Sequence, residues 1–205
     1  MKSDEYRTIK SQSIGIYKDS GSKFIALAQN INSINEAKDK LENIRKEYHD
    51  ARHHCYAYKI GIEDDNWRIN DDGEPSGTAG KPIMGQINSF SLTNILIVVV
   101  RYFGGTLLGT GGLIKAYKTA SSEALKKANI VLMTIQISYI VEFPYKSMNE
   151  IMKLIKDEGI EQSDQVFELD CSIKIRCRKS IEEKIKGRLN MINKVKYKRT
   201  AQDID

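Results

Sequence analysis

The chain has 205 residues, 40% of them hydrophobic and 29% charged, with a formal net charge of +5. This balance is typical of a soluble globular protein and excludes a membrane-spanning one, because no apolar run is long enough to cross a bilayer. Three cysteines without paired spacing exclude a disulfide framework and a zinc ribbon, and no leader pattern opens the sequence, so we expect reduced thiols in a cytoplasmic protein.

The first third of the chain predicts two strands, a helix and a third strand. We expect strands over 6–16 and 23–31, joined by a hairpin turn at 18–21, and the alternation of Phe24, Ala26 and Ala28 points one face of the second strand inward. A capping box at 33–36 starts a helix that we expect to last to about Ala51, and a strand follows over 55–62. His53 and His54 stand where this strand begins. Because such histidines bond backbone more often than metals, we expect one of them to bond to the next loop, residues 71–80.

Glycine is concentrated in one stretch. Nine of the 14 glycines lie between residues 71 and 117. Glycine is costly inside regular elements and useful where φ is positive or where backbone approaches closely, so this crowding predicts loops of specified geometry. We expect a structured loop over 71–80, a short helix or turn opening at Pro82, a strand buried on both faces over 95–100 and a helix over 113–128.

The order strand, glycine loop, helix start can hold an anion, because free backbone N–H groups and the helix dipole point at the loop. Thr110 stands where a phosphate loop needs lysine, and Ile114 where a dinucleotide fingerprint needs its third glycine, so neither nucleotide motif is supported. The glycines between 104 and 112 therefore predict either an anion site or tight turns and close packing, and both alternatives remain open.

Acidic residues precede the glycines, and they suggest an enzymatic alternative. Asp71, Asp72 and His54 could serve a metal-assisted hydrolase acting on a phosphate-containing substrate, because paired carboxylates hold magnesium or perform acid–base work. No nucleophile and base are identifiable by spacing. We therefore expect these acids to shape turns, and we predict no catalytic residue, no metal and no other cofactor.

A change of pattern near residue 129 predicts a second domain. We expect strands over 130–143, 165–170, 172–178 and 194–200, and helices over 146–158 and 181–192. This βαββαβ order is ferredoxin-like, with an antiparallel sheet and both helices on one face. The predicted fold class is therefore α+β, with two domains at 1–129 and 130–205.

One strand of this second domain alternates apolar and basic residues, so one face should be basic. With the last strand it forms a possible nucleic-acid face, made of Lys174, Arg176, Arg178, Lys196, Lys198 and Arg199. Such a face could follow a phosphate backbone. However, no exposed aromatic pair for stacking bases is evident on the strand, and Glu168 and Asp170 could neutralise the charge, so a solvated face stays as the alternative.

Two motifs also carry a resemblance. The segments DDGEPSGTAGKPI at 71–83 and VVVRYFGGTLLGTGGL at 98–113 resemble the signature of the YigZ/IMPACT family. The resemblance implies that residues 1–129 form an Impact N-terminal-like domain, with a left-handed βαβ fold shared by a ribosomal protein domain and by domain IV of elongation factor G. It implies that residues 130–205 form a ferredoxin-like domain resembling domain V of that factor.

The resemblance further implies a functional surface but no catalytic residues. By position, the surface that binds an anion or a partner would comprise His54, Asp71, Asp72, Gly73, Glu74, Pro75, Gly77, Thr78, Gly80, Arg101, Tyr102, Gly104, Gly105, Gly109, Thr110, Gly111 and Gly112. We expect these residues to form one cleft, in which Arg101 and the amides of 109–112 meet phosphate or carboxylate.

The function implied by the resemblance is that of a non-catalytic cytosolic factor in translation or its regulation. Its partner would be RNA, the ribosome or a translation-associated protein, and not a membrane. Eukaryotic members of the family restrain a translational kinase that senses starvation by competing for its activator. They carry an extra N-terminal partner-binding domain, so we do not carry this regulatory role over to the present chain.

Overall fold

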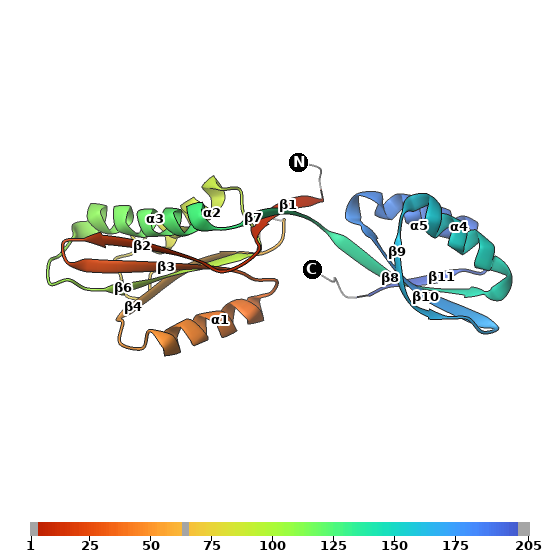
Figure 1. The fold of residues 1–205 in the computed structure, drawn as a ribbon, viewed down its shortest axis with the longest axis horizontal. Coiled ribbons are helices and arrows are strands. Elements are labelled where there is room, and N and C mark those ends of the chain that lie inside the picture. The colour runs from red at the N-terminus through yellow and green to blue at the C-terminus, as the bar shows by residue number, and fades with distance from the viewer. Residues whose placement is uncertain (1–3, 63–65, 201–205) are drawn as a thin grey trace. The chain divides into compact units, whose positions relative to one another are not determined.

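The computed structural model describes residues 4–62 and 66–200, which form a two-domain α+β protein (Figure 1). One compact unit spans residues 6–133. The other spans residues 134–200 together with residues 4 and 5. Among the described residues, no helix combines the length and the apolar character needed to cross a membrane.

The first unit is built on a five-stranded antiparallel sheet in the order β2-β3-β6-β4-β5. Its strands are β2 (Ser13–Asp19), β3 (Ser22–Asn30), β4 (His53–Lys59), β5 (Trp67–Asn70) and β6 (Ile95–Tyr102). Helix α1 (Ile34–Glu47) covers one face, and α2 (Gly80–Ser89) and α3 (Gly109–Lys127) cover the other (Figure 1). The central strand β6 is buried on both faces, as its continuous apolar run predicted.

Close packing of α3 on β2 depends on the absence of a side chain at Gly15. A Cβ atom there would lie 2.3 Å from the backbone nitrogen of Ala124 and 2.4 Å from the carbonyl oxygen of Ala120. Both contacts are far below any van der Waals distance, and both partners are backbone atoms that cannot move away cheaply. Small residues on helix and strand therefore set how near α3 lies to the sheet.

The ends of the first unit differ from the prediction. The predicted strand 6–16 is two strands, β1 (Glu5–Ile9) and β2, because β1 leaves the main sheet and pairs with β7 (Ile130–Thr134). No proline or glycine stands between Ile9 and Ser13 to mark the break, so the sequence pattern did not show that the two strands belong to different sheets. Strand β5 was not predicted, because four residues at a sheet edge carry no recognisable period.

The second unit has the predicted βαββαβ order. Its elements are β8 (Gln136–Pro144), α4 (Met148–Glu158), β9 (Glu161–Val166), β10 (Asp170–Arg178), α5 (Glu182–Met191) and β11 (Lys196–Arg199), with short 3₁₀ turns at Tyr145–Ser147 and Lys179–Ile181. The sheet is antiparallel in the order β11-β8-β10-β9. Both helices pack on one face, where alternate residues of β8 and β10 form the core (Figure 1).

One strand of this unit was predicted in the wrong place. Strand β9 lies at Glu161–Val166 and not at 165–170. All of its side chains are exposed, and its sequence EQSDQV does not alternate between apolar and polar residues. The alternation that indicates a half-buried strand is therefore missing. The predicted range includes Phe167 and Leu169, which lie exposed in the connection that leads to β10.

A buried carboxylate in the second unit should make its stability depend on pH. Asp4 accepts two hydrogen bonds of 3.0 Å from Arg178 and one of 3.2 Å from the amide of Ser180. The bonds from Arg178 lower the pKa of Asp4 to about 2, against the opposing effect of burial. Because this pKa is lower in the folded state than in the unfolded state, the stabilisation is complete above about pH 4 and is lost towards pH 2.

We therefore expect the free energy of opening of β8 and β10, measured by amide hydrogen exchange, to fall between pH 4 and pH 2 in the wild type. It should fall less in Asp4→Asn, which cannot lose a charge. Glu142→Gln removes an exposed carboxylate that forms no ion pair with residues 4–62 or 66–200, and it should retain the wild-type slope. Equal slopes in the wild type and Asp4→Asn would contradict the proposed role of Asp4.

Candidate functional site

The loop between β5 and α2 is organised around the carboxylate of Asp71. Its Oδ2 atom accepts a hydrogen bond from the amide of Gly77 at 2.8 Å, and Oδ1 accepts bonds from Ala79 at 3.0 Å and Gly80 at 2.8 Å. Ala79 is the N-cap of α2 and has no side chain that could cap it, so Asp71 does so instead. Burial raises the pKa of Asp71, but the three amide bonds outweigh it and hold this pKa below its ordinary value.

Asp72 ties the same loop to β4 and α1. Its Oδ1 atom accepts a hydrogen bond from Arg45 at 3.0 Å, and Oδ2 accepts one from the backbone amide of His54 at 2.7 Å. The Nδ1 atom of His53 lies 2.8 Å from the carbonyl oxygen of Asp72. The prediction that a histidine at the start of this strand bonds to the loop is confirmed.

A buried polar network joins the loop to β6 and α3. The Oε1 atom of Glu74 lies 2.6 Å from Nη1 of Arg101 and accepts a hydrogen bond of 2.7 Å from the hydroxyl of Tyr117. The sulfur of Cys55 lies 3.3 Å from that hydroxyl. Burial raises the pKa of both the Tyr117 phenol and the Cys55 thiol, so both groups are protonated and the thiol is not a ready nucleophile.

The guanidinium of Arg101, which we expected to meet a phosphate or carboxylate ligand, meets a carboxylate of the chain itself. Arg101 is only 6% exposed, and its guanidinium lies 5.4 Å from the ring centre of Phe24 and 5.7 Å from that of Phe103. Within the part of the chain that the structure describes, its Nε atom has no hydrogen-bond partner. The ion pair with Glu74 thus joins the two glycine-rich segments, 73–80 and 104–112, since Arg101 lies three residues before Gly104.

The other residues expected in the loop shape its backbone. Gly73 and Gly77 have φ of +86° and +77°, which glycine adopts without strain. The hydroxyl of the buried Thr78 donates a hydrogen bond of 2.7 Å to the carbonyl oxygen of Pro75. Gly80 lies against β5, where a Cβ atom would come within 2.9 Å of the backbone nitrogen of Asn70.

The connection from β6 to α3 lies against the β2–β3 hairpin. A Cβ atom on Gly104 would lie 1.9 Å from the carbonyl carbon of Gly21, and the Gly104 amide donates a hydrogen bond of 3.1 Å to the hydroxyl of Ser22. The Tyr102 hydroxyl donates a hydrogen bond to Asp50, which raises the pKa of Tyr102 to about 12. Gly105 has φ of +89° and has open space around the position of its missing Cβ.

Residues 109–112 form the first turn of α3, which begins earlier than the predicted residue 113. Gly109 has φ of +68°, so glycine is needed where the chain enters the helix. The N-cap Leu108 makes no side-chain capping bond, and the first amides of any helix lack acceptors within it. Thr110 is exposed on this turn. Anion binding by these amides stays a prediction.

Sequence reasoning missed the contributions of Cys55, Tyr117 and Arg45. Tyr117 lies on the buried apolar side of α3, one turn after Leu113. Its hydroxyl group was the signal that this side of the helix could hydrogen-bond to a buried polar group such as Glu74. Cys55 directly follows the two histidines expected to bond to the loop, but neither Cys55 nor Arg45 lies in a motif that would have assigned it to the loop.

The second candidate site is the uncovered face of the sheet in the second unit. Lys174 of β10 and Lys198 of β11 are both paired with Ile140 of β8, and they lie on its two sides. The neighbouring row places Ser172, Glu142 and Lys196 side by side. We call this surface the basic face; its cations are Lys174, Arg176, Lys196 and Lys198.

Two of the predicted cations do not contribute to the basic face. Arg178 forms ion pairs with Asp4 at 3.0 Å and Glu5 at 3.2 Å. Arg199 is the next residue of β11 after Lys198, so its side chain points to the other face of the sheet. Its positive charge helps to lower the pKa of Glu182 on α5. Arg176 remains on the face, with Nη1 3.9 Å from a carboxylate oxygen of Glu161.

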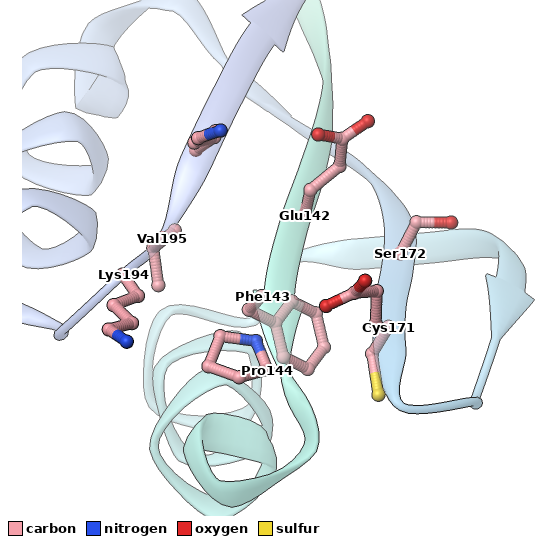
Figure 2. Close-up of a pocket in the computed structure, with 9 residues that line it drawn as sticks. Glu142, Phe143, Pro144, Cys171, Ser172, Lys194 and Val195 are labelled. Carbon is pink, nitrogen blue, oxygen red and sulfur yellow. The ribbon is translucent and has the colours of Figure 1, made fainter.

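A cavity of about 660 Å³ lies at the end of the basic face. Glu142 and Ser172 line it from neighbouring strands, and Lys194 and Val195 line it from the segment that leads into β11 (Figure 2). The full lining is Glu142, Phe143, Pro144, Asp170, Cys171, Ser172, Lys194, Val195 and Lys196. The lining holds two carboxylates, Glu142 and Asp170, and two lysines, Lys194 and Lys196, so this end of the face is of mixed charge.

The buried network should be essential for the stability of the first unit. Glu74→Gln leaves the Arg101 guanidinium without a counter-charge in the interior, and breaking a buried pair in this way costs roughly 3–5 kcal/mol. Tyr117→Phe removes one donor to Glu74 and should cost about 1–3 kcal/mol. Urea unfolding followed by the fluorescence of Trp67, which lies in this unit, measures both changes.

Glu123→Gln, on the solvent side of α3, removes only an exposed ion pair with Lys126; it is the matched control and should leave the unfolding free energy close to that of the wild type. If Glu74→Gln were as mild as this control, the ion pair would not be what holds the loop to β6.

Comparison with known proteins agrees with this architecture. The family model of the Impact N-terminal domain matches residues 20–125. The chain is 40% identical over 136 residues to the IMPACT family member YigZ of Escherichia coli (strain K12), covering 65% of this chain and 67% of the relative. It is 34% identical over 166 residues to an IMPACT family member of Haemophilus influenzae, covering 80% and 81%.

A solved structure shares the whole architecture. It is the crystal structure of a hypothetical protein, with a TM-score of 0.71 and 27% sequence identity, and the match covers 98% of this chain and 99% of the other. The resemblance noted in the two glycine-bearing motifs is thereby confirmed over the N-terminal unit and beyond it. The chain belongs to the IMPACT family.

Proposed function

We propose that the protein is a non-catalytic factor that binds RNA through the basic face, in translation or its regulation. The observation that carries the proposal is the register of this face, where Lys174 and Lys198 lie on either side of Ile140 and no helix of the described unit covers them. Side chains on such a face are about 7 Å apart along a strand and about 10 Å apart across two strand spacings. A grid of cations with these spacings suits an extended polyanion.

The shape of the surface favours RNA over a small anion. Small ligands prefer concave pockets that enclose most of their surface, whereas a sheet face offers many weak contacts spread over an area. The formal net charge of +5 adds a long-range attraction to polyanions. No aromatic side chain lies on this face in the described parts of β8, β10 and β11, so we expect recognition of the backbone and little dependence on base sequence.

The geometry of the first unit favours a non-catalytic role. The oxygens of Asp71 and Asp72 accept hydrogen bonds from the chain, and Glu74 is paired with Arg101. The metal-assisted hydrolase would need the first two carboxylates to bind a metal, so the internal bonds weigh against it. Translation as the setting rests on membership of the IMPACT family and on what the family resemblance implies.

Removing two lysines from the basic face should weaken RNA binding uniformly across RNA sequences. We expect the double variant Lys174→Ala/Lys198→Ala to lower the affinity for an RNA hairpin. The slope of log affinity against log salt should become less steep by about 2, since each lost phosphate contact retains about one counterion. Fluorescence anisotropy of a labelled hairpin at several salt concentrations measures both quantities.

The double variant Lys153→Ala/Lys156→Ala removes the same charge from exposed positions of α4, on the other side of the sheet, and is the matched control. The proposal would be wrong if this control lost as much affinity as the basic-face variant, or if wild-type binding did not respond to salt.

A further inference from the structure

Trp67 is the one tryptophan of the sequence, and it lies largely exposed on the edge strand β5. Its exposed fraction is 52%. Ile69, two residues later and therefore on the same face of the strand, packs against the core under α2. Burying an indole ring stabilises a protein more than burying most other side chains, so an exposed one beside a cavity suggests a binding surface.

A cavity of about 460 Å³ lies beside this ring, within the size range of small-molecule sites. Among the described residues it is lined by Lys59, Trp67, Met84 and Asn88. Lys59 is the register partner of Trp67 on β4, and Met84 and Asn88 are one turn apart on α2. The walls are therefore an indole ring, a thioether, a lysine side chain and one primary amide.

We propose that this cavity binds a nucleobase, either of a free nucleotide or at an unpaired position of RNA. The indole ring offers a face on which any base can stack. The amide of Asn88 carries a donor and an acceptor side by side, which matches the edge of a base. The thioether of Met84 and the aliphatic part of Lys59 are adaptable apolar surfaces for the remainder of the ring.

The short edge strand disfavours a peptide in the same place. Strand addition derives its affinity from main-chain hydrogen bonds along an exposed edge, and β5 offers an edge of only four residues. A flat aromatic ligand needs no such edge. The nucleobase site lies within the first unit and does not depend on the basic face of the second, so it goes beyond the RNA contact proposed above.

The tryptophan itself is the reporter. We expect its emission, corrected for absorption by the ligand, to be quenched by at least one of AMP, GMP, CMP and UMP, and not by inorganic phosphate or ribose 5-phosphate. Tighter quenching by an unstructured oligonucleotide than by the mononucleotide would assign the site to RNA, and equal affinity would assign it to a free nucleotide. Absence of quenching by all four nucleotides, or equal quenching by ribose 5-phosphate, would overturn the proposal.

Variants separate stacking from other effects. Asn88→Ala keeps the reporter and should weaken nucleotide binding roughly fivefold or more. Ser89→Ala, at the next position of α2 and outside the lining, should bind as the wild type does. Nucleotide binding followed by calorimetry should be reduced about five- to hundredfold in Trp67→Ala and largely retained in Trp67→Phe. Equal binding by Trp67→Ala and the wild type would overturn the proposal.

One further comparison distinguishes this site from the basic face. In Lys174→Ala/Lys198→Ala, quenching of Trp67 by the mononucleotide should be unchanged even where hairpin binding is lost. If this variant lost both Trp67 quenching and hairpin binding, the quenching would depend on nucleotide binding at the basic face, and the proposed nucleobase site would be wrong.

Discussion

The structure depends on a charged pair that is tolerable in the interior only when it is complete. Glu74 and Arg101 are both almost fully buried, and each would be costly there without the other. The pair is 27 residues apart in sequence, and Tyr117 joins it from 43 residues beyond Glu74. Because the three come from a loop, a strand and a helix, none of these can shift without exposing an unpaired charge. Asp71, three residues before Glu74, then fixes where α2 starts and so where Met84 and Asn88 face Trp67.

The crowding of glycine predicted specified backbone, and the structure agrees at Gly73, Gly77 and Gly104. It could not predict what the neighbouring charges do. A single sequence shows that acids, an arginine and glycine amides are present, but it does not show which acid meets which donor when the partners are tens of residues apart. The pattern was therefore equally compatible with an external anion and with the internal carboxylates that occupy Arg101 and the Gly77 and Gly80 amides.

In the second unit too, local patterns could be predicted from the sequence and long-range pairing could not. Alternation of polarity along β10 predicted its apolar and basic faces, because that signal is local. Pairing is not local: Arg178 continues the basic alternation, yet it meets Asp4, 174 residues away. Strand β9 has no apolar residue before Val166 to mark it, since it lies at an edge with every side chain exposed. Elements buried on at least one side could be predicted, whereas the short edge strand β5, the fully exposed edge strand β9 and the long-range partners could not.

The strand order of the first unit has a consequence for synthesis of the protein. β3 and β4 each pair with β6, and not with each other, so the centre of the sheet is filled by the last of its strands to be translated. Until residue 102 has left the ribosome, β3 and β4 present unpaired backbone and apolar side chains such as Leu27 and Tyr56. Folding of this unit therefore waits on contacts between distant parts of the chain, which are slow to form. A nascent chain stalled before β6 would be prone to aggregate and a natural client for chaperones.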